Sequence, residues 1–148
     1  MKRRAILEVM VASAVLLIPG TSRAAGDERR VTLYKDPSCG CCEAYAAHLR
    51  GNRFEVAIVR TSELPDLFEK YGIPAELESC HIAMIDNYLV VGHVPAGVVD
   101  RLLSEKPRIA GISLPGMPSG SPGMNGPKMT PFKIYVIGEG APQLYTVA

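Results

Sequence analysis

The chain has 148 residues, a net charge of +1, four cysteines and no tryptophan, and 47% of its residues are hydrophobic. This length supports one ordinary domain and argues against a second. No run or stripe of Lys and Arg is present outside the first few residues, so the composition argues against nucleic acid as a partner.

The first 24 residues have the pattern of a secretory signal peptide. Three basic residues at positions 2–4 precede a mostly apolar run from Val9 to Ile18, and Ser22-Arg23-Ala24 supplies small residues two apart. This run is much shorter than the roughly 20 residues of a membrane-spanning helix. We therefore expect cleavage after Ala24 and a mature domain over residues 25–148 that is not membrane-bound. An uncleaved, membrane-tethered start is the alternative. Cleavage removes four bases and one acid, which changes the net charge from +1 to −2.

The next elements alternate between strands and helices. Residues 31–34 predict a short buried strand, and the turn residues at 35–38 lead into the cysteine motif. Cys42, Tyr45, Ala46 and Leu49 fall on one helical face. The elements predicted after this helix are a strand over 54–58, a helix over 62–71, a hairpin from 82–85 and 88–91, and a helix between Pro95 and Pro107. The order β-α-β-α-β-β-α indicates an α/β fold with a mixed sheet.

The segment from Ile109 to Pro131 differs in character, because ten of its 23 residues are Gly or Pro. A loop of this length inside a compact domain is usually functional or disordered. It holds Met117, Met124 and Met129. Two closing strands are predicted after it, over 132–137 and 143–147.

The four cysteines are Cys39, Cys41 and Cys42, in the motif Cys-Gly-Cys-Cys, and Cys80. An even number in an exported chain first suggests structural disulfides. Three cysteines within four residues cannot join distant loops, however, and such crowding favours redox groups or metal ligands. Thiols at a helix N-terminus also have lowered pKa values, which favours the thiolate that both chemistries need. Structural disulfides and a purely redox site remain alternatives.

This order of elements, with cysteines between the first strand and the first helix, resembles the thioredoxin superfamily. The resemblance implies that the loop before the third strand, which holds Cys80, meets the loop of the Cys-Gly-Cys-Cys motif. It also shows two departures: Cys41 fills an inner position of the C-x-x-C motif, and Ser79-Cys80-His81 replaces the cis-proline of redox members. Both departures add candidate metal ligands and remove features that thiol–disulfide oxidoreductases of this superfamily carry. A soft, thiolate-rich site suits Cu(I), and zinc second.

Four motifs sharpen this interpretation, and they occur in the same order as in one bacterial family. They are Asp36-Pro37-Ser38-Cys39-Gly40-Cys41-Cys42, Ser79-Cys80-His81, Gly92-His93-Val94-Pro95-Ala96, and the run from Pro115 to Met124. The family, first known as a domain of unknown function, includes the periplasmic CopG-type copper-resistance proteins. The resemblance implies a thioredoxin-like fold, a periplasmic location, and a Cu(I) cluster bridged by Cys39, Cys41, Cys42 and Cys80 and linked to copper redox chemistry.

Two histidines and two methionines are further candidate ligands. His81 follows Cys80 directly, and regular strand alternation would point the two side chains to opposite faces. His93 precedes a predicted helix, so it can either cap that helix or bind metal. No helical or strand pattern explains Met117 and Met124, which favours thioether ligation of copper.

The remaining histidine and a strand methionine are predicted to have no site role. His48 lies in mid-helix away from the Cys42 face, where we expect it to be solvated. Met84 lies within a predicted strand, where we expect core packing.

We therefore predict a copper-binding protein of copper resistance or homeostasis. Its expected partners are copper ions and a periplasmic copper chaperone or exporter, with no nucleic acid and no membrane once the signal is cleaved. The alternative is an enzyme, a thiol–disulfide oxidoreductase that uses Cys39 and Cys42. A hybrid, in which the site cycles copper between oxidation states, lies between these two.

Overall fold

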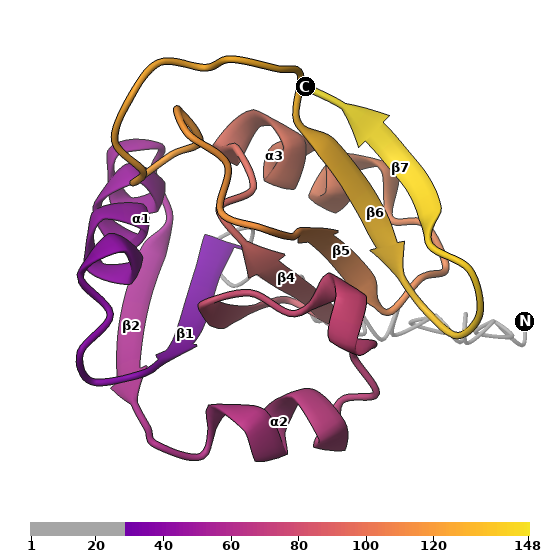
Figure 1. Ribbon diagram of the computed structural model, residues 1–148, viewed down its shortest axis with the longest axis horizontal. Coiled ribbons are helices and arrows are strands. Elements are labelled where there is room, and N and C mark those ends of the chain that lie inside the picture. Colours follow the sequence, from indigo (N-terminus) through magenta and orange to yellow (C-terminus); the bar gives the residue numbers. More distant parts are fainter. Residues whose placement is uncertain (1–28) are drawn as a thin grey trace, which may run out of the picture.

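The computed structural model describes residues 29–148, so the predicted signal peptide lies outside the described residues. Within this part the chain forms one seven-stranded mixed sheet with three α-helices (Figure 1). The strands are β1 (Arg30–Lys35), β2 (Glu55–Arg60), β3 (His81–Ile85), β4 (Tyr88–Gly92), β5 (Gly111–Leu114), β6 (Lys133–Ile137) and β7 (Gln143–Val147). The helices are α1 (Gly40–Gly51), α2 (Leu64–Lys70) and α3 (Ala96–Glu105), with a short 3₁₀ turn at Ala75–Leu77. None of the described helices is long and apolar enough to span a bilayer.

The sheet confirms the predicted mixed α/β class and the predicted order of its first seven elements. Its strand order is β2-β1-β3-β4-β5-β6-β7. β1 is parallel to β2 and antiparallel to β3, and β4 is antiparallel to β3 and parallel to β5. β5, β6 and β7 pair antiparallel at the far side. The likeness to thioredoxin itself stays an inference from this order of elements.

Each face of the sheet carries its own apolar core. On one face α1 and α3 pack, through side chains such as Tyr45, Leu49 and Leu102, against Val31, Leu33 and the inward residues of β4 to β6. On the other face α2 packs through Leu64 and Phe68 against a smaller cluster. Met84 belongs to this second cluster and accepts a 3.5 Å contact from the Tyr71 hydroxyl, in agreement with the packing role predicted for it.

The prediction that residues 109–131 form one continuous loop was wrong. Gly111–Leu114 forms β5, which pairs with both β4 and β6. A Cβ at position 111 would lie 1.9 Å from the backbone oxygen of Leu89, so a glycine here permits the strands to approach. Ile112 and Leu114 are buried in the core, which supplies the free energy for pairing. The irregular part is therefore shorter, and is called the 115–132 loop below.

The sheet topology brings several loops to one edge. β1 ends at Lys35, which lies opposite His81, the first residue of the antiparallel β3. β4 and β5 both end at this edge, where Gly92 pairs with Leu114. The cysteine motif after β1, Cys80 before β3, His93 after β4 and the 115–132 loop after β5 therefore all start or end at the same place.

Candidate metal centre

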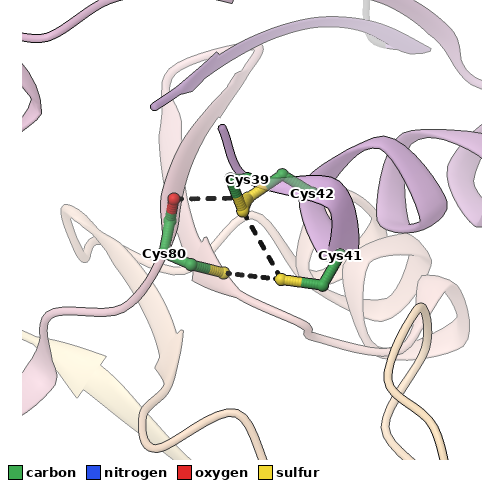
Figure 2. Close-up of side chains that lie close together, drawn as sticks. All are labelled: Cys39, Cys41, Cys42 and Cys80. Atoms are coloured by element: carbon green, nitrogen blue, oxygen red, sulfur yellow. Dashed lines mark hydrogen bonds between the residues drawn. A yellow bond between two sulfur atoms is a disulfide. The ribbon is translucent and has the colours of Figure 1, made fainter. Parts of the chain in front are cut away.

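The four cysteines converge as predicted. Their sulfur atoms all lie within 4.8 Å of one another, although Cys42 and Cys80 are 38 positions apart in the sequence (Figure 2). Cys39 and Cys42 are joined by a disulfide, and Cys41 and Cys80 are free thiols. The Cys41 sulfur is 3.4 Å from Cys39 Sγ and 3.9 Å from Cys80 Sγ. The result is a compact group of four sulfurs, two of them oxidised in this state.

The start of α1 positions three of these sulfurs. Cys39 is the N-cap, in extended conformation, and its N–H donates to Asp36 O over 3.1 Å. The Asp36 carboxylate in turn accepts from the Ser38 N–H and hydroxyl, which closes the preceding turn. Cys42 is fully buried in the core at the face predicted from the helical pattern, whereas Cys41 is half-buried. One turn of helix thus presents one sulfur to the core and another to the surface.

Cys80 links this group to the two predicted histidines. Its sulfur lies 3.4 Å from His81 Nδ1 and 3.0 Å from His93 Nε2. Cys80, His81 and His93 form a second group whose ligand atoms all lie within 4.8 Å of one another. His81 is therefore near the site although it follows Cys80 directly. Cys80 precedes β3 rather than lying within it, so strict alternation of side chains does not apply.

His93 has the arrangement typical of a metal-binding histidine. Its Nδ1 lies 2.6 Å from the carbonyl oxygen of Pro122, and because that oxygen can only accept, Nδ1 carries the proton. Nε2 therefore points a lone pair at the Cys80 sulfur. Fixing one ring nitrogen by a backbone carbonyl is how proteins orient histidine ligands. His93 does not cap α3, which was the alternative role predicted for it.

Burial keeps the groups around Cys80 uncharged. Burial and then the charge of nearby Cys41 raise the pKa of the Cys80 thiol to about 12. Burial and then the neighbouring His93 ring lower the pKa of His81 to about 3, and burial also lowers the pKa of His93. Both imidazoles are therefore neutral near pH 7, the form that binds metals. His81 Nε2 is also the one buried side-chain nitrogen or oxygen among residues 29–148 that has no hydrogen-bond partner.

Tyr45 was predicted only as a core residue of α1, yet it supports both histidine rings. It is fully buried, and its hydroxyl donates to Val94 O over 2.8 Å. Its ring stacks on His81 at 4.6 Å between centroids and meets the edge of His93 at 5.3 Å. The helical face through Cys42 and Tyr45 is the one sequence signal that links this residue to the site.

His48 and Lys35 have roles that no sequence pattern indicated. His48 was predicted to be solvated, and this was wrong: it is half-buried, and its Nε2 accepts from the first N–H of α3, at Ala96, over 3.1 Å. Lys35 is 1% exposed. Its ammonium donates to Glu43 Oε1 over 3.2 Å and lies 3.5 Å from Pro37 O, so it ties the turn before Cys39 to the first turns of α1. The same contact lowers the pKa of Glu43.

The 115–132 loop reaches the site through its backbone at 122–123. Pro122 O holds His93, and Gly123 lies so close to α1 that a Cβ there would be 2.7 Å from Tyr45 N and 3.0 Å from Cys41 O. Met124 is the next residue and is half-buried, with its N–H bonded to Ser121 O. Met117 is 39% exposed, with a left-handed φ of 45°. The structure thus places Met124 beside the residues that contact the site and Met117 on an exposed turn.

Comparisons with known proteins agree with this geometry. A family model described as "Protein of unknown function, DUF411" matches residues 77–124, the range that contains Cys80, both candidate histidines and both candidate methionines. No curated protein sequence matches the chain. Two solved structures, titled copper resistance protein CopG, forms 2 and 1, are each 30% identical to it, with TM-scores of 0.73 and 0.72. Each match covers 80% of this chain, and 97% and 96% of the respective structure. A sulfur-rich group that can hold a metal, together with this identity over nearly all of the related chains, shows that the protein belongs to the CopG-type family of copper-resistance proteins.

Proposed function

We propose that this protein is an exported, periplasmic copper-binding protein that holds Cu(I) as a thiolate-bridged cluster. The observation that carries the proposal is the convergence of four cysteine sulfurs within 4.8 Å, with Cys80 shared by a second group that adds two neutral imidazoles. Thiolate is the ligand that Cu(I) prefers, and imidazole also suits copper. The proposed ligands are Cys39, Cys41, Cys42, Cys80, His81 and His93. Zinc is the second choice of metal.

The number of ligands supports more than one copper ion. Four thiolates and two imidazoles exceed what a single Cu(I) uses, and a thiolate can bridge two ions. Cys80 is the natural bridge, because its sulfur faces Cys41 on one side and His93 on the other. In the state described here Cys39 and Cys42 form a disulfide, so the full ligand set becomes available only after reduction.

The 115–132 loop supports a covering role over this cluster. Its Pro122 and Gly123 already contact His93 and α1, which leaves Met124 within reach of the site. We propose that Met124, and Met117 after a shift of its exposed turn, contribute thioether ligands and shield Cu(I) thiolates from water and oxidant. Thioethers are soft ligands that favour Cu(I).

A redox role for the same site is supported by the Cys39–Cys42 pair. This disulfide can be reduced to two thiols, and two thiols can return one electron each to Cu(II). We propose that the protein cycles copper between oxidation states as well as holding it. A periplasmic copper chaperone or exporter is the partner that such a cycle needs for delivery or removal of Cu(I).

A thiol–disulfide oxidoreductase is the second candidate function. The observation that favours it is the disulfide between the N-cap of α1 and the third residue of that helix. Against it, Cys41 adds a third thiol beside the pair, and Cys80 with its histidine neighbours occupies the position before β3. These features supply metal ligands where an oxidoreductase needs room for a protein substrate.

Titration of the reduced protein with Cu(I), against a competing Cu(I) chelator, tests the proposal. We expect saturation above one equivalent for the reduced protein and a lower capacity for the form with the Cys39–Cys42 disulfide. Cys80→Ser should lower the capacity most, because both groups share Cys80. Ser79→Ala is the matched control, since Ser79 adjoins Cys80 and supplies no soft ligand. Saturation of the reduced wild type at one equivalent or fewer would exclude the cluster.

A further inference from the structure

The two free cysteines lie next to each other and come from separate elements. Cys41 is in the first turn of α1 and Cys80 immediately precedes β3, 39 positions later in the sequence. Their sulfurs are 3.9 Å apart and point toward each other (Figure 2). A disulfide bond is about 2.05 Å long. Both side chains are half-buried, so part of each is accessible to a small oxidant.

Once the Cys39–Cys42 bond has formed, each of these thiols has only the other as a thiol partner. Cys39 Sγ is nearer to Cys41 Sγ, at 3.4 Å, but it is already bonded to Cys42. Residues 29–148 contain all four cysteines of the chain, so no other thiol competes. Without thiol–disulfide exchange, further oxidation of this state therefore gives one intramolecular disulfide, between Cys41 and Cys80.

We propose that Cys41 and Cys80 form a second disulfide, so that the four cysteines act as two redox pairs that together supply four electrons. The inference rests on the proposed function, because it takes Cu(II) as the oxidant. In the step, the two S–H bonds break, one S–S bond forms, each of two Cu(II) ions gains one electron to become Cu(I), and two protons leave to solvent. The Cys39–Cys42 pair carries out the same step, so the fully reduced chain converts four Cu(II) to four Cu(I).

The second pair also couples oxidation to release of copper. Thiolate is the ligand for Cu(I), and a disulfide sulfur is a poor substitute. When only Cys39–Cys42 is oxidised, Cys41, Cys80 and the two histidines remain as ligands. When the second bond forms, no thiolate is left. The reduced chain, the chain with the Cys39–Cys42 disulfide and the chain with both disulfides thus hold progressively less Cu(I). Formation of the Cys41–Cys80 bond releases the copper that the second of these states still holds.

Peptide mapping distinguishes this bond from the first one. Trypsin cleaves after Lys35 and Arg50 to release peptide 36–50, which contains Cys39, Cys41 and Cys42, and after Lys70 and Arg101 to release peptide 71–101, which contains Cys80. The Cys39–Cys42 bond lies within one peptide, whereas a Cys41–Cys80 bond joins the two. The protein is reduced, oxidised without oxygen by diamide or by Cu(II), alkylated and digested.

The double variant Cys39→Ser/Cys42→Ser isolates the proposed pair. With diamide we expect joined peptides that separate on reduction, and with Cu(II) we expect two equivalents of Cu(I), measured with a Cu(I)-specific chelator. The wild type should lose all four thiols and yield four equivalents. Cys41→Ser/Cys80→Ser is the matched control, which should yield two equivalents and no joined peptides.

The two oxidants separate failure of the pair from failure of the proposed function. If diamide leaves the wild type with two thiols and no joined peptides, the second pair is excluded, whatever copper does; this arm does not depend on folding of a variant. If diamide joins the peptides but Cu(II) is not reduced, the second pair stands and copper is excluded as its oxidant.

Discussion

The contact between Gly123 and α1 predicts that the substitution Gly123→Ala opens the 115–132 loop. Gly123 has a φ of 85°, and an added Cβ would lie 2.7 Å from Tyr45 N and 3.0 Å from Cys41 O. Both are backbone atoms within a helix and cannot give way, so the loop must move instead. A left-handed φ costs an alanine about 1–2 kcal/mol. Displacing the loop also breaks the bond between Pro122 O and His93, which adds about 1 kcal/mol.

Gly116→Ala is the matched control for this prediction. Gly116 lies in the same loop with a φ of 80°, but a Cβ there meets nothing within 4 Å. Gly116→Ala should therefore lower the free energy of unfolding only by the cost of placing alanine at a left-handed φ, about 1–2 kcal/mol. Urea denaturation gives the free energy of unfolding of each variant, and trypsin cleavage after Lys128, the one basic residue between Arg108 and Lys133, reports loop opening. Equal stability loss and equal cleavage in the two variants would refute the idea that Gly123 fastens the loop.

Four further outcomes follow from the site. Burial lowers the pKa of His81 to about 3, so below about pH 6.5 the unfolded chain binds a proton at this residue that the folded chain does not, and the free energy of unfolding falls as the pH falls. Between pH 6.5 and 4.5, urea denaturation of the metal-free wild type should show a decrease in the free energy of unfolding about 2 kcal/mol larger than in His81→Gln. Because the pKa of the Cys80 thiol is raised to about 12, Cu(I) must displace its proton to bind there. The measured Cu(I) affinity should therefore rise between pH 6 and 8 by about tenfold per pH unit for each proton displaced, and this dependence on pH should be weaker in Cys80→Ser. Replacing Met117 and Met124 by Leu should lower Cu(I) affinity and stop copper from protecting the loop against trypsin, whereas Met129→Leu, at a residue 75% exposed, should change neither. Insulin reduction should be slow, because Cys41 and Cys80 crowd the Cys39–Cys42 pair, and a rate comparable to that of thioredoxin would favour the oxidoreductase.

The parts of this fold that sequence patterns revealed are those set by local signals. Alternating and continuous apolar runs located β1 to β4, and the helical spacing of Cys42, Tyr45 and Leu49 gave the buried face of α1. The resemblance of this order of elements to the thioredoxin superfamily then implied that Cys80 meets the cysteine motif. β5 was missed because it has only four residues and begins with glycine, and its stability comes from pairing with two distant strands.

Side-chain roles that depend on tertiary contacts were not visible in the sequence. Lys35 looks like an exposed turn residue, yet Glu43, eight positions on, and the carbonyl of Pro37 hold its ammonium in the interior. His48 lies on the polar side of its own helix, and only the approach of α3 gives it the Ala96 N–H as a donor. Such contacts have no periodicity, because they join elements whose distance is set by the packing of the whole domain.

The electrostatics around Cys80 explain why this corner of the fold suits a cation. A neutral thiol and two neutral imidazoles are buried here at a lower cost than an unpaired thiolate or imidazolium, which would lose its hydration. A bound cation such as Cu(I) would reverse this balance, because it would supply the positive charge that a thiolate needs and would accept a lone pair from a neutral imidazole. The metal-free site is thus uncharged while the Cys80 thiol is protonated, and we expect binding of a cation there to release that proton.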